Sequence, residues 1–251
     1  HVTERPGGTR RGQGNKKGSA LKNEEKLRKG ERTRRTLKKT ALQLFAERGL
    51  NNVSIRDIQV AAGQKNNGSI TYYFASRDAL IRELVTDVGK VLDAANNERL
   101  DALEAAGGPK TVREVTDLLL PSFPLPEVAG KEEADYSMRF FSTVLISHRD
   151  LLFEATAGQD RATRRIYAHI RRLAPQMPAE LLQQRLMLVL LYSLSAGASM
   201  EAAQADHKAW KHLWGSRSAR SNLIDTMTAI ITGPVSEETM GLVDMPKLFP
   251  Q

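Results

Sequence analysis

The sequence predicts an all-α protein, and three observations support this fold class. Apolar residues recur at the three- and four-residue spacing of a helix face along most of the chain. No stretch shows the sustained alternation of polar and apolar residues that marks a half-buried strand, and no strand, glycine loop and helix follow one another. The segments between the helical stretches contain the glycine and proline residues that end helices.

Composition narrows the classes of function. The 251 residues are 41% hydrophobic and 26% charged, which is enough chain for a large core. The absence of cysteine excludes disulfide frameworks, thiolate nucleophiles, zinc fingers and iron–sulfur clusters, and it suits a reducing compartment. The longest apolar stretch without a charge, 186–200, has 15 residues, whereas a membrane span needs about 20. We therefore expect a cytoplasmic protein without a transmembrane helix.

The positive charge is concentrated at one end of the chain. The formal net charge is +8, but residues 1–39 alone contain 14 Lys and Arg against 4 Glu. The remaining 212 residues have a net charge of −2. A concentrated basic end implies a polyanionic partner, for which nucleic acid is the first candidate and an anionic membrane surface the second.

The first part of the chain predicts a basic arm and four helices. Residues 1–23 are rich in Gly, Arg and Lys and should form a disordered basic arm. A helix over 24–48 ends at a glycine, and a second one opens on the capping box of Ser54 and Asp57. A short third helix ends near residue 74. The fourth helix begins after Ser76, which is its N-cap, and runs to about residue 106.

The rest of the chain also predicts helices. Three prolines within 121–126 exclude a helix there. The remaining helical segments are expected at 111–120, 132–147, 159–173, 179–204 and 217–232. We expect a first domain over 24–76, a larger helical bundle over 77–235 and a C-terminal tail over 236–251.

The second and third helices follow the plan of a helix-turn-helix domain. Two short helices are joined by a glycine turn, and a supporting helix and a basic segment precede them. In the third helix Ile70 and Phe74 would point inward, which leaves polar side chains facing outward. Asn can read adenine, Lys prefers guanine and Thr can contact a thymine methyl group. The candidate base-reading residues are Lys65, Asn66, Asn67, Ser69, Thr71 and Tyr72.

Several spaced motifs in residues 33–85 resemble the N-terminal domain of the tetracycline-repressor (TetR) family. They are Thr40–Gly49, Val53–Ile58, Ala61–Gly63, Gly68–Ile70, Tyr72–Phe74 and Ser76–Leu80. A glycine turn alone also occurs in ordinary helical bundles, but this combination is far more specific. Two departures fall on the reading surface: four residues separate Gly63 from Gly68 where the family usually has three, and Thr71 replaces a common tyrosine.

The resemblance implies a set of contacts to DNA phosphates. Ser54, Tyr73 and Arg77 match the phosphate-contacting positions of the family. Ser54 can also act simply as a helix cap, a role worth about 1 kcal/mol. Arg34 and Arg35 would lie near the DNA backbone or lead the arm into the minor groove, although a solvated charged face explains them nearly as well.

The second half resembles an effector-binding and dimerisation domain in the length and order of its helices. Bulky apolar side chains with few charges nearby favour a small apolar or aromatic effector. The candidate pocket residues are Phe123, Met138, Phe141, Val144, Leu145, His148, Tyr167 and Met187, with Phe140 beside them. Most of these side chains could equally be plain core.

The last two long helices carry the apolar faces expected of a homodimer interface. The candidate interface residues are Leu190, Leu194, Leu223, Met227 and Ile230. A symmetric dimer would present two recognition helices about 34–36 Å apart to a palindromic operator in double-stranded DNA. We expect no cofactor, and His207 and His212 lack the spacing of a metal site.

The sequence therefore predicts a ligand-responsive repressor, and two alternatives stay open. One is a non-specific architectural protein that binds DNA through its basic tail. The other is an all-α enzyme, but neither a paired Glu-x-x-His motif nor a nucleophile with a base is present, and Glu132 and Glu133 have no histidine at ligand spacing. We expect no catalytic residues and no membrane partner.

Overall fold

The computed structural model describes residues 13–64, 72–120, 135–205 and 211–243, and every regular element in these ranges is a helix. This confirms the predicted all-α class. The elements are α1 (Gln13–Arg48), η1 (Leu50–Asn52), α2 (Ile55–Ala61), α4 (Arg77–Ala105), α5 (Val112–Asp117), α7 (Ser137–Ser147), α8 (Arg149–Thr156), α9 (Arg161–Leu173), α10 (Ala179–Ala205), α11 (Lys211–Trp214), α12 (Ala219–Thr232) and α13 (Glu237–Gly241).

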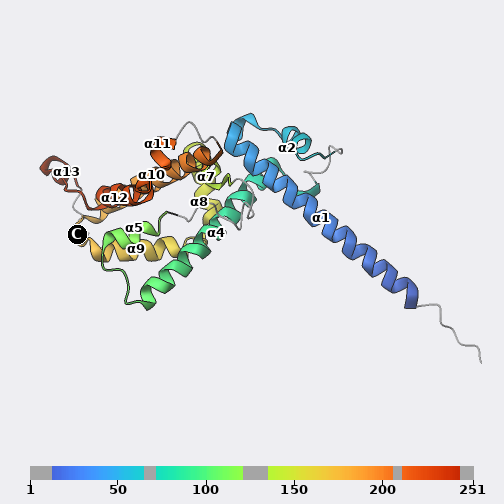
Figure 1. The fold of residues 1–251 in the computed structure, drawn as a ribbon, viewed down its shortest axis with the longest axis horizontal. Coiled ribbons are helices and arrows are strands. Elements are labelled where there is room, and N and C mark those ends of the chain that lie inside the picture. The colour runs from blue at the N-terminus through green and yellow to red at the C-terminus, as the bar shows by residue number, and fades with distance from the viewer. Residues whose placement is uncertain (1–12, 65–71, 121–134, 206–210, 244–251) are drawn as a thin grey trace, which may run out of the picture.

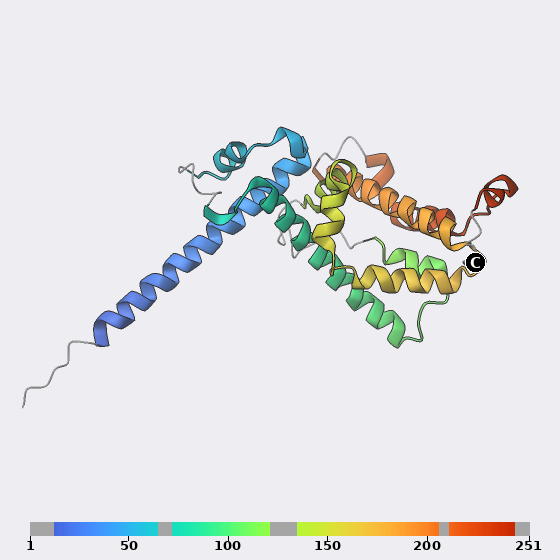
Figure 2. The same cartoon turned by 180° about the vertical axis from the view of Figure 1, so that it is seen from behind.

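Helix α1 is longer than predicted and extends well beyond the rest of the molecule (Figures 1 and 2). It begins at Gln13, so 13–23 are helical and the prediction of disorder for that part of the arm is wrong. The physical reason is that Lys, Leu and Ala in this stretch favour helix and extend a helix already nucleated over 24–48, in spite of Gly14 and Gly18. Residues 1–12 of the arm lie outside the described ranges.

A first hydrophobic cluster joins the helix-turn-helix region to the bundle. It combines Leu37 and Phe45 of α1 with Ile58 of α2 and Leu80 of α4, all fully buried. Phe140 of α7 belongs to the same cluster, and its ring centroid lies 6.3 Å from that of Phe45. Helices α4 and α7 are thus the two elements that connect the N-terminal helices to the rest of the core.

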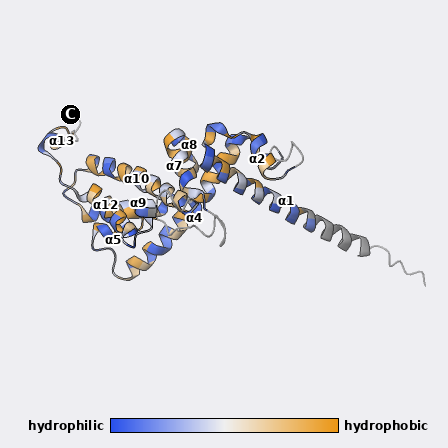
Figure 3. Ribbon diagram, turned by 45° about the horizontal axis from the view of Figure 1, so that its top comes forward, coloured by the Kyte–Doolittle hydropathy of each residue, from blue (hydrophilic) through white to orange (hydrophobic). Residues whose placement is uncertain are grey.

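A second cluster forms the core of the bundle. It is built from α5, α9, α10, α12 and the far part of α4, and includes Leu100, Ile166 and Met227. In Figure 3 much of α10 and α12 carries the hydrophobic colour, whereas the coloured residues of the projecting part of α1 are largely hydrophilic. The described residues of the projecting helix therefore form no apolar face, and those of the bundle do.

The segment after His148 differs from the prediction. The turn expected there is a kink between two helices, because His148 is both the C-terminal cap of α7 and the N-terminal cap of α8. Its backbone angles, φ −143 and ψ 49, break α7 without adding a loop. Two predicted helix ends are confirmed: Gly49 and Gly63 have φ of +79 and +66, the left-handed conformation that glycine adopts most readily.

Helix α10 is long and apolar enough to cross a membrane by length and composition alone. It lies instead against α7 and α12, and only 39% of its most apolar window is buried inside the protomer. The apolar remainder is therefore a surface of this helix that the protomer itself leaves uncovered.

Candidate DNA-binding interface and effector cavity

The start of α2 is stabilised by the hydrogen bonds of a local helix cap. The Ser54 hydroxyl accepts a hydrogen bond from the N–H of Asp57, and the Asp57 carboxylate accepts one from the N–H of Ser54 at 2.8 Å. The Ser54 hydroxyl also donates to the Asp57 carboxylate at 2.6 Å, and this bond together with the one from the Ser54 N–H lowers the pKa of Asp57. The predicted capping box is present and Ser54 is exposed at the start of α2, whereas its phosphate contact stays a prediction.

Ion pairs fix α1 to the first part of α4. Glu83 of α4 accepts hydrogen bonds from Arg34 at 2.5 Å and from Lys38 at 2.8 Å, and Lys38 also pairs with Asp87. Burial opposes ionisation of Glu83, but the hydrogen bonds from Lys38 and Arg34 outweigh it and lower the pKa of its carboxyl group. The guanidinium of Arg34 also lies 4.9 Å from the centre of the Phe74 ring. The Arg34 side chain therefore binds groups of the protein itself, whereas Arg35 is exposed.

Arg77 is likewise occupied by the protein itself. Its guanidinium donates to the backbone carbonyls of Val53, at 3.0 Å, and of Leu50, and it stacks over the Phe45 ring at 5.3 Å. These contacts tie the start of α4 to the segment between α1 and α2. The phosphate contact predicted for Arg77 stays a prediction, and most of its side chain already has partners.

Of the residues predicted to read DNA bases, only Tyr72 lies within the described residues. Lys65, Asn66, Asn67, Ser69 and Thr71 lie outside the described residues. Tyr72 is 80% exposed, and its ring stands edge-on to that of half-buried Tyr73, with centroids 5.0 Å apart. The Tyr73 hydroxyl lies against Gly30 of α1, where an added Cβ would come within 3.7 Å of it. Tyr72 is thus presented outward, while Tyr73 contacts the supporting helix.

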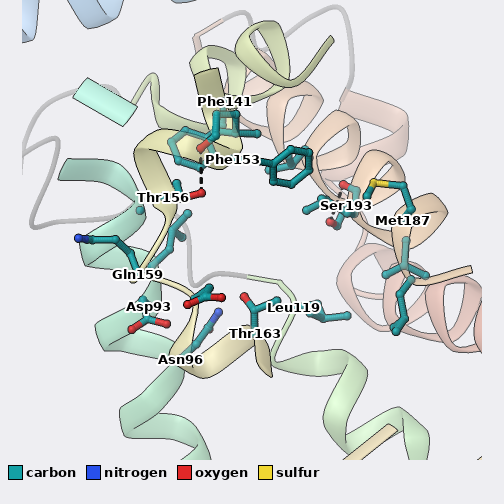
Figure 4. A pocket seen from close by; sticks show the side chains of 18 of the residues that line it. Asp93, Asn96, Leu119, Phe141, Phe153, Thr156, Gln159, Thr163, Met187 and Ser193 are labelled. Carbon is teal, nitrogen blue, oxygen red and sulfur yellow. Dashed lines mark hydrogen bonds between the residues drawn. The ribbon is translucent and has the colours of Figure 1, made fainter. Parts of the chain in front are cut away.

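A cavity of about 360 Å³ lies within the bundle (Figure 4). Five helices line it, and their lining side chains include Leu92 of α4, Phe141 of α7, Phe153 of α8, Tyr167 of α9 and Leu190 of α10. Polar lining residues come chiefly from α4 and from the turn between α8 and α9. They are Asp93, Asn96, Thr156, Gln159, Asp160, Thr163 and Ser193. The cavity has the size and the mixed lining of a small-molecule site.

The structure brings together only part of the predicted pocket. Met138, Phe141, Tyr167 and Met187 line the cavity, and burial raises the pKa of the Tyr167 hydroxyl. Phe140, Val144 and Leu145 are buried in the first cluster and are core residues, and His148 is not among the lining residues. Phe123 lies outside the described ranges. Helical spacing marks an inward face, but it does not separate cavity lining from solid core.

The predicted dimer residues are largely internal. Leu223 and Met227 are 3% and 0% exposed inside the second cluster, so their assignment to a dimer face is wrong. Leu194 is buried, and it and Leu190 line the cavity, while Ile230 is half-buried against the second cluster. The cause is that both faces of α10 and α12 are apolar, and the sequence does not say which face meets the protomer's own core.

Glu201 is a buried group that the sequence did not single out. Its carboxylate accepts the backbone N–H of Met138 at 2.6 Å and that of Arg139 at 2.9 Å, which anchors the start of α7 to α10. Burial raises its pKa to about 8, against the lowering effect of these hydrogen bonds. No local pattern could have revealed this contact, because its partners are 63 and 62 residues away.

Helices α1 and α2 and the start of α4 share one apolar cluster, and the segment expected to form the recognition helix is described only from Tyr72 onward. Residues 37–84 match the family model of the bacterial regulatory proteins of the tetR family. The N-terminal domain of this chain is therefore a tetR-family domain, which confirms the resemblance drawn from its sequence. No curated protein sequence matches the chain.

Two solved structures assigned to tetR-family transcription regulators align with most of this chain. One, from Shewanella sp. PV-4, is 18% identical, covers 78% of this chain and 95% of its own, and superposes with a TM-score of 0.51. The other, from Mesorhizobium loti MAFF303099, is 13% identical, covers 80% of this chain and 94% of its own, and has a TM-score of 0.44. The first shows that the fold of a helix-turn-helix domain followed by a helical bundle extends through this chain.

Proposed function

We propose that this protein is a ligand-responsive repressor that binds a palindromic operator as a homodimer and is released by a small, largely apolar effector. It acts in the cytoplasm and by binding alone, without catalysis. The observation that carries the proposal is the course of α4. One helix is fixed to the DNA-binding helices through Arg77 and Glu83 and then lines the cavity with Leu92 and Asp93.

The route from the cavity to α1 is short and made of described contacts. An effector that displaces the cavity-lining part of α4 must also move the part that holds α1 through Lys38 and Glu83. Helix α7 supplies a parallel connection, because Phe141 faces the cavity and Phe140 lies in the same cluster as Phe45 of α1. Effector binding would favour a conformation with misplaced recognition helices, which lowers operator affinity.

The uncovered apolar surface of α10 supports the homodimer. Leu188, Leu191 and Tyr192 are 54%, 39% and 38% exposed, although they lie in a long apolar helix. Tyr192 reaches Thr226 of α12 at 3.1 Å, so the surface continues onto α12. We assign the dimer contact to this face in place of the buried leucines predicted from the sequence.

Selection of operator DNA tests the proposal. Binding sites selected from random-sequence duplexes should be palindromic, and binding to them should survive excess competitor DNA. Tyr72→Ala should weaken binding to the selected site at least about fivefold, because a good base contact is worth about 1–3 kcal/mol. Met240→Ala, an exposed apolar residue of α13, is the matched control and should leave affinity unchanged. Selected DNA without symmetry, or binding abolished by competitor, would support the architectural alternative instead.

A further inference from the structure

We infer that the cavity binds a cationic amphiphile, a molecule with an apolar or aromatic body and one ammonium group. This inference rests on the proposal that the cavity is an effector site and names the class of effector. It follows from how the polar and apolar lining residues are distributed.

The cavity has two chemically different sides. Figure 4 shows Asp93, Asn96 and Thr163 close together on one side, where α4 meets the beginning of α9, with Phe141 and Phe153 on the other. The side chains of the first group offer oxygen acceptors, and those of the second offer aromatic faces. A ligand that satisfies both sides needs hydrogen-bond donors at one end and an apolar body at the other.

The polar side carries negative charge. Asp93 and Asp160 both line the cavity, and the described lining residues include no Lys, Arg or His. A carboxylate or phosphate would be repelled here, whereas an ammonium group offers three donors and the opposite charge. Phe141 and Phe153, on the opposite side, are left to contact the apolar body of the ligand.

The N-terminus of α9 lies on the polar side and would favour an anion, but a carboxylate of the protein already caps it. Helix α9 begins at the cavity, and a helix N-terminus attracts negative charge. The N–H of Ala162 in its first turn is taken by Asp93 at 2.7 Å, and Asn97 donates to the other oxygen of the same carboxylate at 3.0 Å. The helix end is thus capped from within the chain, which leaves little for an anionic ligand to bind.

Asp160 is the acceptor best placed for the ligand. Its Oδ1 atom is buried and has no hydrogen-bond partner. The Nη2 atom of Arg164 lies 3.1 Å from it as an ion pair, but that arginine side chain is 70% exposed. Exposed pairs of this kind are worth about 1 kcal/mol or less, so an ammonium group inside the cavity can compete for the carboxylate.

Three ligands with the same apolar body but different head groups distinguish cationic, neutral and anionic effectors. Phenylbutylamine, phenylbutanol and phenylbutyrate share their ring and chain and differ only in an ammonium, hydroxyl or carboxylate head. Isothermal titration calorimetry on the full chain near neutral pH should show the amine binding at least tenfold more tightly than the alcohol, with the carboxylate weakest. Equal affinities, tighter binding of the carboxylate, or failure of all three to bind would overturn the inference.

Two aspartate variants test the assigned contact. Asp160→Asn keeps the side-chain shape and breaks no helix cap, because the Asp160 side chain makes no capping hydrogen bond. It should reduce the advantage of the amine over the alcohol to threefold or less. Asp101→Asn removes the same charge from an exposed residue paired with Arg165 and should retain the full advantage. Loss of the advantage in both variants would indicate a general charge effect and overturn the role of Asp160.

Operator binding separates this inference from the proposed function. If the amine binds as predicted but leaves operator affinity unchanged, the ligand class stands and the effector mechanism fails. If the alcohol or the carboxylate releases the operator and the amine does not, the effector mechanism stands and the ligand class fails.

Discussion

The first turns of α4 and the turns in its middle differ in what their side chains face. Near its start, Arg77 and Glu83 are bound to partners from α1 and from the segment before α2. Further along, Leu92 and Asn96 face a cavity, and the neighbouring Asp160 keeps a buried oxygen without a hydrogen bond. A helix that is anchored to α1 at its start and faces a cavity along its middle turns can transmit ligand binding to the anchored start.

The largest effect should come from a pair of phenylalanine truncations that contrasts these regions. Phe45→Ala removes a fully buried ring that Arg77 stacks on, and it should lower the free energy of unfolding by about 3–5 kcal/mol. Phe153→Ala, at the cavity and 43% exposed, should cost less than about 1 kcal/mol. Urea unfolding followed by circular dichroism measures both. Equal losses would show that the two regions do not differ in packing.

The second-largest effect should be the pH dependence of folding stability that Glu201 causes. Glu201 holds the start of α7, the second helix that connects the cavity to α1. Its pKa is raised from the ordinary 4.5 to about 8 in the folded protein, so the folded state holds a proton that the unfolded state releases between these values. Stability should therefore fall as pH rises through this window, with a slope on the order of 1 kcal/mol per pH unit. Below about pH 4.5 the carboxyl group is protonated in both states and this contribution to the slope disappears.

Unfolding of Glu201→Gln across the same pH range isolates this contribution. The amide mimics the protonated acid, so the fall in stability should flatten in the variant. Glu180→Gln, at an exposed position of the same helix, is the control and should keep the slope of the original protein. A slope that is unchanged in Glu201→Gln would mean that the carboxyl group titrates normally when folded.

The smallest effect on stability should come from the ion pairs at the anchored end. The double variant Glu83→Gln, Asp87→Asn removes the partners of Arg34 and Lys38 at a cost of about 1 kcal/mol, because these side chains are partly exposed. The matched control is Arg82→Gln, which breaks a more exposed pair with Glu154. It should cost a few tenths of a kcal/mol at most. A loss as large as that of Phe45→Ala would indicate that the ion pairs, rather than the apolar contacts, hold α4 in place.

Local signals in the sequence were sufficient for most of the long helices and several of their ends, but not for the start of α1 at Gln13 or for α8 and α13. Ser54 and Thr111 open helices with capping boxes, and Gly49 ends α1 in the left-handed conformation. The contacts that define the sites join residues far apart in the sequence, such as Lys38 with Glu83, and leave no periodic trace. The sequence also could not predict that Met227 is buried inside the protein, because an apolar helix face does not show which element covers it.

Operator titration of the original protein and of the double variant Glu83→Gln, Asp87→Asn tests the central claim, that α4 transmits binding from the cavity to the DNA. Fluorescence anisotropy with the selected operator should be measured with and without saturating phenylbutylamine. In the original protein the amine should weaken operator binding at least tenfold, and in the variant, whose α4 is less firmly attached to α1, the loss should be reduced to about threefold or less. The same loss in both proteins would contradict transmission through the anchored end of α4.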